Sequence, residues 1–179
     1  MNLGDTFLSN GLLEIGLFQT DDTRMSYRLR LDLLPAYPGV LGACATQVAD
    51  RLMGVDRLVC PSDSVPLGVA VSLQTKIPLV YSRGKGEAPV QDWVGAYDVG
   101  HPAALLCHTL PNHETFALWH KQLTSVGLQL IQVIAIVEMK RLTIDLPTHA
   151  LFRLDDWLRL PPENLPAGAA KTMLSDLEK

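Results

Sequence analysis

Two apolar segments on either side of one amphipathic helix constrain the fold of this chain more than any other feature. The helix is expected from Asn112 to about Val126, and Gly127 ends it. The flanking segments, "AALLCHT" and "LQLIQVIAIVE", are apolar almost throughout, which is typical of strands buried on both faces of a sheet. A strand, a helix and a strand in this order predict a βαβ unit with parallel strands.

The same alternation extends over most of the chain. A helix is expected from about Pro38 to Gly54, and another in "PLGVAVSLQT". Short strands are expected at "DRLVC", "IPLVYS" and "WVGAY", and "THALFRLDDWL" predicts a last strand and helix. Repeated βαβ units predict an α/β fold, with a mostly parallel twisted sheet of about five strands and helices on both faces. Ligands of such sheets bind at the carboxyl ends of the strands.

The N-terminal part of the chain predicts two further elements. Phe7, Leu12 and Ile15 have helical spacing, and Asp5 is the expected N-cap of that helix. In "SYRLRLDLL", apolar and charged residues alternate, which predicts a half-buried strand over Tyr27–Leu33.

Length and charge limit the class of protein. With 179 residues, we expect one domain over residues 1–160 and a tail, residues 161–179, that is Pro-rich and then weakly helical. A net charge of −4 argues against nucleic-acid binding. The start does not look like a signal peptide, and the longest apolar run is shorter than the ~20 residues of a membrane-spanning helix. Three scattered cysteines form no disulfide framework, so we expect a cytoplasmic protein that does not bind membranes.

Four segments carry a resemblance to a known family: "GLLEIGLF", "SYRLRLDLLPAYPGVLGACATQVADRL", "VPLGVAVSLQTKIPLVYSRGKGE" and "THALFRLDDWL". In this order and spacing they resemble orotate phosphoribosyltransferase, a type I phosphoribosyltransferase. The resemblance implies that family's fold, with a small hood built from N-terminal and C-terminal segments. It also implies a homodimer, with an interface in the exposed region Tyr27–Leu34, and a nucleobase or nucleotide as the small-molecule partner.

The phosphate-binding motif of the family is matched without a gap by "ALLCHTLPNHETFALW". In the family, two acidic residues at the end of a strand hold the ribose hydroxyls of phosphoribosyl pyrophosphate. A Thr-Thr-Gly-Gly-Ser-like loop then cradles the 5′-phosphate with its backbone N–H groups. Here Cys107 and His108 take the positions of the acids. The loop positions are taken by residues without a glycine: Pro111, Asn112, His113, Glu114 and Thr115.

These replacements weaken the phosphate site. Pro111 has no N–H to donate, and His113 and Glu114 make backbone conformations with φ > 0 costly where the family has glycines. The carboxylate of Glu114 is favourable at the helix N-terminus and repels a phosphate there. Only Thr115 keeps a family-like hydroxyl. We therefore expect this loop not to bind phosphoribosyl pyrophosphate.

Three other contacts of the family are weakened as well. The pyrophosphate loop is "PSDSVP", in which Asp63 places a carboxylate where pyrophosphate oxygens bind in the family. The mobile catalytic loop is short, and no lysine stands near the position of the family's orotate-binding lysine. Arg83 and Lys85 are what remains of the catalytic loop. The candidate residues for binding another ligand are Ser62, Asp63, Ser64, Asn112, His113, Glu114, Thr115 and Arg24.

Three functional hypotheses follow. The first is an orotate phosphoribosyltransferase-like protein that has lost transfer activity and binds a nucleobase, a nucleotide or a protein partner, without a cofactor or metal. The alternative is an active orotate phosphoribosyltransferase that forms orotidine monophosphate with Mg²⁺ and atypical site residues. The third uses Asp63, Cys107, His108 and Glu114 as a metal site or a nucleophile–base set. Against it, Cys107 and His108 are neighbours on a strand and alternate in direction, and a buried cysteine is more often a small hydrophobic residue.

Overall fold

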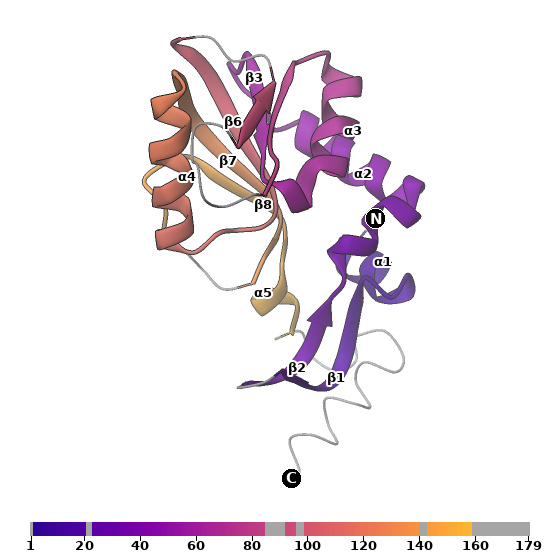
Figure 1. Ribbon diagram of the computed structural model, residues 1–179. Coiled ribbons are helices and arrows are strands. Elements are labelled where there is room, and N and C mark those ends of the chain that lie inside the picture. Colours follow the sequence, from indigo (N-terminus) through magenta and orange to yellow (C-terminus); the bar gives the residue numbers. More distant parts are fainter. Residues whose placement is uncertain (1, 21–22, 85–91, 96–98, 140–142, 159–179) are drawn as a thin grey trace.

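The computed structural model describes residues 2–20, 23–84, 92–95, 99–139 and 143–158. Its central feature is a twisted six-stranded sheet in the order β5-β4-β3-β6-β7-β8 (Figure 1). All neighbouring strands are parallel except β5, which is antiparallel to β4. The predicted α/β fold with a mostly parallel sheet is confirmed. The strands are β3 (Arg57–Cys60), β4 (Leu79–Ser82), β5 (Trp93–Gly95), β6 (His101–Thr109), β7 (Leu128–Glu138) and β8 (Thr148–Arg153).

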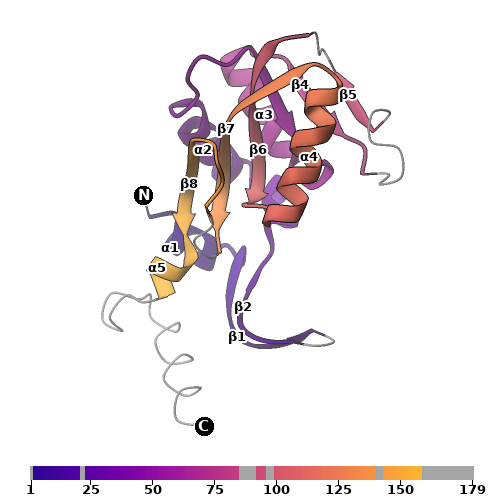
Figure 2. The same ribbon diagram turned by 90° about the vertical axis from the view of Figure 1, so that its left-hand side faces the viewer.

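Helices cover both faces of this sheet, as the βαβ pattern predicts. α2 (Pro38–Ala49) and α3 (Val65–Thr75) pack on one face, and α4 (His113–Ser125) packs on the other (Figure 2). Successive side chains of β6 enter the two cores in turn: Leu106 is buried with α2 and α3, and Leu105 is buried under α4. Because strand side chains alternate, His108 continues the row of Leu106 on the α2–α3 face.

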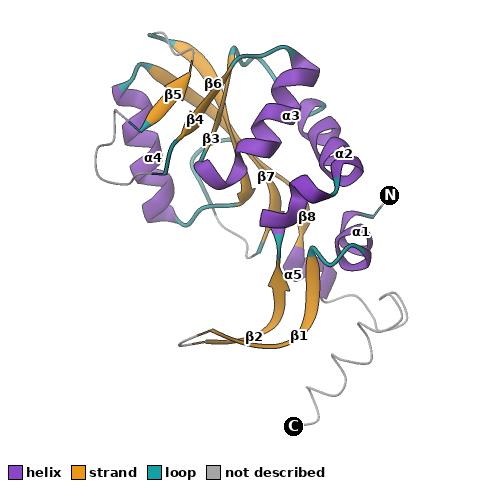
Figure 3. Cartoon of the chain, turned by 45° about the vertical axis from the view of Figure 1, so that its right-hand side comes forward, coloured by secondary structure: helices purple, strands orange, loops and turns teal. Residues whose placement is uncertain are grey.

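A second, two-stranded sheet extends away from the main sheet (Figure 3). It is the antiparallel hairpin of β1 (Leu13–Thr20) and β2 (Thr23–Leu29). α1 (Leu3–Ser9) leads into it and lies against α5 (Leu154–Leu158) from the other end of the described chain. A Cβ placed on Gly4 of α1 would lie 2.6 Å from the indole nitrogen of Trp157, so the N-terminal and C-terminal segments are in close contact.

The first helix is shorter than the sequence pattern predicts. Asn2 caps it in place of Asp5, because the Asn2 side-chain oxygen accepts a 3.0 Å hydrogen bond from the N–H of Gly4. The helix then stops, and Gly11 has a φ of +66°, a conformation that glycine adopts at no steric cost and that turns the chain into β1. The prediction of a helix through Ile15 is therefore wrong.

The predicted strand Tyr27–Leu33 is wrong in its second half. β2 ends at Leu29, and Leu31–Ala36 form a 3-10 helix, η1. Leu31 and Leu34 are both buried, because residues three apart lie on the same side of a 3-10 turn. These two leucines pack into the core, whereas Arg28 and Asp32 of the same region are exposed, so the dimer interface that the resemblance implies here stays a prediction.

Of the two predicted helix ends, that of α2 is wrong and that of α4 is confirmed. α2 ends before Asp50, short of Gly54, whereas α4 has the predicted limits, with Asn112 as its N-cap and Gly127 just beyond its end. Among the described ranges, no helix is long and apolar enough to span a bilayer. The predicted tail, residues 161–179, lies outside the described residues.

Candidate ligand site at the carboxyl end of the sheet

The turn from β6 to α4 contains Asn112, whose side chain caps the N-terminus of the helix. The side-chain oxygen of Asn112 accepts a 2.8 Å hydrogen bond from the N–H of Thr115, and the N–H of Leu110 donates to the carbonyl of Val137 at 3.1 Å. Pro111 has no N–H. Leu110, Pro111 and Thr115 therefore offer no free amide to a phosphate, although N-terminal amides of a helix are its usual binding groups.

The side chains of this turn add negative charge. Glu114 lies in the first turn of α4 and is exposed, as are Asn112 and His113. A carboxylate at this end of a helix is stabilised by the positive end of the helix dipole. The dipole that would attract an incoming phosphate thus already interacts with Glu114.

His108 occupies a buried place at the end of β6. Only 5% of it is exposed, its backbone N–H donates a 2.9 Å hydrogen bond to the hydroxyl of Ser64, and its Nε2 has no hydrogen-bond partner among the described residues. Burial lowers the pKa of the imidazole, and the nearby carboxylates of Asp63 and Asp32 act in the opposite direction. Where the family has a carboxylate to accept hydrogen bonds from ribose, this chain thus has an imidazole whose neutral form burial favours.

The turn from β3 to α3 is tied to β6 through Ser64. Ser64 is completely buried in η2 (Ser62–Ser64), and its hydroxyl accepts from His108 N–H while donating to the Asp63 carboxylate at 2.8 Å. The sequence suggested Ser64 as a donor to a ligand, and in the structure its hydrogen bonds are made inside the protein. Ser62 and Asp63 are exposed beside it.

The segment that follows β4, Arg83 and Gly84, lies against the turn that contains Ser62. The N–H of Arg83 donates to the carbonyl of Asp92 at 2.9 Å, and the hydroxyl of Ser82 donates to the Asp92 carboxylate. Gly84 has a φ of +72°, and a Cβ placed on it would lie 2.8 Å from the hydroxyl oxygen of Ser62. Backbone and Ser62 thus approach closely here, and only glycine fits.

Two of the predicted ligand contacts are not described. Lys85 lies outside the described residues. Arg24 lies on β2, paired with Gln19, and its side chain is outside the described part of the chain. The structure therefore brings together the turn of Ser62 and Asp63, the buried His108 and the segment that begins at Arg83.

The cysteines do not form a reactive site with His108. Cys107 points to the α4 face of the sheet, opposite His108, and its thiol lies 3.8 Å from the carbonyl oxygen of Ile134. Burial raises the pKa of Cys107, and burial together with the Asp63 carboxylate raises that of Cys60 to about 12. A nucleophilic cysteine needs the opposite shift. Within the described ranges, no three His, Cys, Asp or Glu residues are placed to hold a metal ion.

Sequence comparison and structure comparison give different results. No protein-family model and no curated protein matches the sequence. Solved structures do match. The UMP synthase of Leishmania donovani matches with a TM-score of 0.77 and 19% identity over 98% of this chain and 41% of that one. The orotate phosphoribosyltransferase of Francisella tularensis matches with a TM-score of 0.71 and 16% identity, over 97% and 96% of the two chains.

A third match, the orotate phosphoribosyltransferase of Aeropyrum pernix, has a TM-score of 0.69 and 13% identity over 87% of this chain and 96% of that one. Adenine phosphoribosyltransferases are also among the matches. The chain therefore has the fold of the type I phosphoribosyltransferases, as its sequence motifs suggested. It spans less than half of the UMP synthase chain and nearly the whole of both orotate phosphoribosyltransferases.

One residue near the site was missed from the sequence. Asp32 lies in η1 close enough to act on the His108 imidazole. The sequence pattern placed it on the polar face of a strand, so nothing in that pattern indicated a position beside β6. A signal was present in the spacing of Leu31 and Leu34, which fits a helical turn.

Proposed function

We propose that this chain is a phosphoribosyltransferase-like protein that no longer transfers phosphoribosyl groups and instead binds a nucleobase or nucleotide in a regulatory or interaction role. The observation that carries the proposal is the Asn112 cap, which takes up the Thr115 N–H in the turn that holds the 5′-phosphate in the family. A phosphate that used the Thr115 N–H would have to displace that cap. Loss of an N-cap hydrogen bond alone costs about 1 kcal/mol.

Charge adds to this cost. Glu114 stands at the start of α4, and Asp63 is exposed in the turn that corresponds to the pyrophosphate loop. Two unit charges of the same sign about 4 Å apart repel by about 4 kcal/mol at an effective dielectric constant near 20. Phosphoribosyl pyrophosphate carries several negative charges, so it meets this repulsion at both ends.

An assay of orotidine monophosphate formation tests the proposal. The chain is incubated with orotate, phosphoribosyl pyrophosphate and Mg²⁺, and the Francisella tularensis enzyme serves as positive control. We expect no product above the rate without protein. Turnover that depends on the chain and on Mg²⁺ would instead establish an active enzyme with atypical contacts and would end the proposal.

We further propose a homodimer in the cytoplasm. Val69 and Leu73 lie one turn apart on α3 and are 44% and 66% exposed, which gives this helix an apolar outer edge. Cys44, Cys60 and Cys107 are free and buried, as is usual in a reducing compartment. Light scattering should give twice the chain mass, and Leu73→Glu should reduce it to that of one chain. A monomeric mass for the unmodified chain would contradict this.

A further inference from the structure

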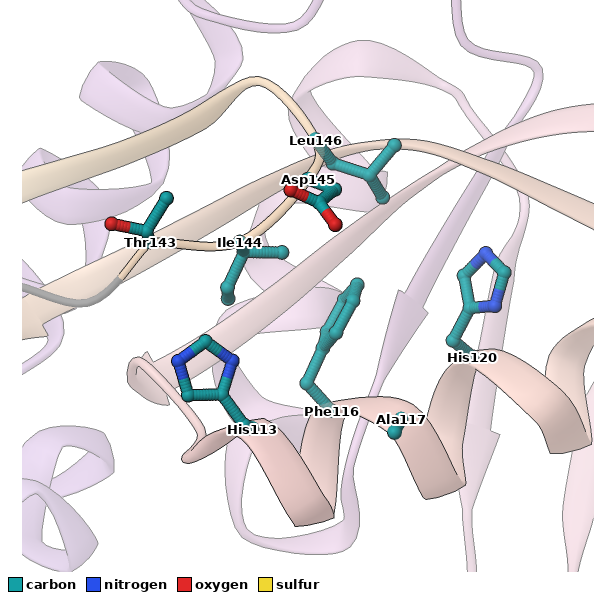
Figure 4. A pocket seen from close by; sticks show the side chains of 8 residues that line it. All are labelled: His113, Phe116, Ala117, His120, Thr143, Ile144, Asp145 and Leu146. Carbon is teal, nitrogen blue, oxygen red and sulfur yellow. The ribbon is translucent and has the colours of Figure 1, made fainter.

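A pocket lies on the α4 face of the sheet, on the side away from His108. It has a volume of about 790 Å³ and opens between α4 and the segment that precedes β8 (Figure 4). Sites for small molecules usually have ~300–1,000 Å³, so a ring system with a sugar fits. The helix contributes residues of one face, at positions 113, 116, 117 and 120, and the facing segment contributes residues 143–146.

Flat rings form the helix side of the pocket. Figure 4 shows His113, Phe116 and His120 in a row along α4, with their rings toward the facing segment. The ring of Phe116 is half-buried, and its centroid lies 5.8 Å from that of His120. Ala117 also lines the pocket and has no side chain beyond Cβ. The Phe116 and His120 rings are tilted by 40° to each other, and aromatic rings of this kind pack well against a planar heteroaromatic ligand.

The facing segment supplies an apolar cover and one acid. Ile144 is buried and Leu146 is half-buried, and the Ile144 side chain points toward the helix (Figure 4). Between them Asp145 is exposed at the pocket and brings the only carboxylate among the described lining residues. No lysine or arginine belongs to that described lining. A carboxylate accepts hydrogen bonds, so the favoured ligand presents N–H donors and does not depend on a phosphate.

We propose that this pocket binds a neutral planar base with an amino group next to a ring N–H, the donor pair of guanine. The base packs against the Phe116 ring, and the Asp145 carboxylate accepts from its two N–H groups. Paired hydrogen bonds to one carboxylate are stronger and more selective than a single one. A metal ion is not the alternative occupant, because the described His and Asp residues here are not placed to hold one.

Calorimetric titration with guanosine and inosine tests the ligand class. The two nucleosides differ only in the 2-amino group. We expect guanosine to bind at least about fivefold more tightly, since inosine loses one hydrogen bond to a charged acceptor. Guanosine monophosphate should bind no more tightly than guanosine. Equal affinity for guanosine and inosine, binding of the monophosphate alone, or no binding of guanosine at millimolar concentration would each overturn the proposal.

Variants of α4 and of Asp145 locate the site. Ala117→Trp fills the pocket and should abolish guanosine binding, whereas Leu118→Trp, at a neighbouring position that is 52% exposed and outside the pocket lining, should not. Asp145→Asn should remove the preference for guanosine over inosine, and Asp50→Asn, an exposed acid on α2's end, should leave it unchanged. Thermal unfolding checks that each variant is folded. Guanosine affinity that survives Ala117→Trp in a folded protein would place any binding elsewhere.

Discussion

Two turns of the same kind connect a strand to a helix at the carboxyl edge of the sheet, and they are stabilised in different ways. The turn from β3 to α3 is stabilised by a neighbouring strand, because the hydroxyl of buried Ser64 accepts a hydrogen bond from the backbone N–H of His108 on β6. The turn from β6 to α4 is stabilised by a local contact, because the side chain of Asn112 accepts a hydrogen bond from the N–H of Thr115 in the helix that follows. Both solutions use hydrogen-bonding groups that such turns otherwise offer to a ligand.

If the phosphate site is lost, as proposed, this difference explains how a phosphoribosyltransferase fold can persist without it. The fold depends on the two cores, which lie within the sheet and under the helices. The turns depend on a few polar contacts that can face either a ligand or the protein itself. Here the contacts of Ser64 and Asn112 face the protein, so they stabilise the turns themselves. The following variants test that assignment.

The largest effect is expected at Ser64. Ser64→Ala leaves the buried N–H of His108 without a partner, so the free energy of unfolding should fall by about 2 kcal/mol. Urea unfolding measures the change. Ser62→Ala, on the exposed neighbour, should change it by less than about 0.5 kcal/mol. Equal effects of the two variants would contradict the difference between a buried link and an exposed side chain.

A smaller loss is expected at Asn112. Asn112→Ala removes the cap of α4 and should lower the free energy of unfolding by about 1 kcal/mol, while Asn112→Asp keeps an oxygen that accepts from the Thr115 N–H and should retain most of the stability. The measurement is again urea unfolding. If alanine and aspartate behaved alike, the cap would not be what closes this turn.

The buried imidazole should make stability depend on pH. The pKa of His108 is lowered in the folded chain, so below pH ~6.5 the unfolded chain binds more protons and the free energy of unfolding decreases as the pH falls. For one group this amounts to less than about 1 kcal/mol between pH 7 and pH 6. His108→Gln should reduce the decrease, and His149→Gln, an exposed site, should not. An unchanged pH profile in His108→Gln would show that this residue is not the cause.

The smallest effect is expected at Glu114. Its carboxylate interacts with the α4 dipole from the exposed first turn, so Glu114→Gln should lower the free energy of unfolding by about 0.5 kcal/mol in dilute buffer. High salt screens this interaction and should remove most of the difference. A loss that is the same in dilute buffer and in concentrated salt would point to a cause other than charge.

Regular elements were predictable from the sequence where one periodicity ran over the whole element. β6, α4 and β7 were found with nearly correct limits because their apolar patterns are long and Gly127 separates them. The N-terminal region was not, since Leu12 and Ile15 fit a helical spacing by chance while Gly11 turns the chain into a strand. Short patterns fit both periodicities, and tertiary packing decides between them.

The candidate site was predictable only in part. The motif residues were found because a resemblance placed them, yet their hydrogen bonds depend on neighbours far apart in the sequence. Ser64 and His108 are 44 residues apart and meet only because β3 and β6 are adjacent. The pocket at Phe116 likewise needs residues 143–146 from beyond β7. No spacing rule joins such positions, because the order of strands in the sheet is what brings them together.

Calorimetric titration of the chain with phosphoribosyl pyrophosphate and Mg²⁺ is the most direct measurement of what these two turns can hold. Asn112 caps its helix, and Glu114 and Asp63 add carboxylates, so we expect no saturable heat of binding at phosphoribosyl pyrophosphate concentrations below millimolar. A micromolar dissociation constant that is lost on altering the turn after β6 would contradict the account.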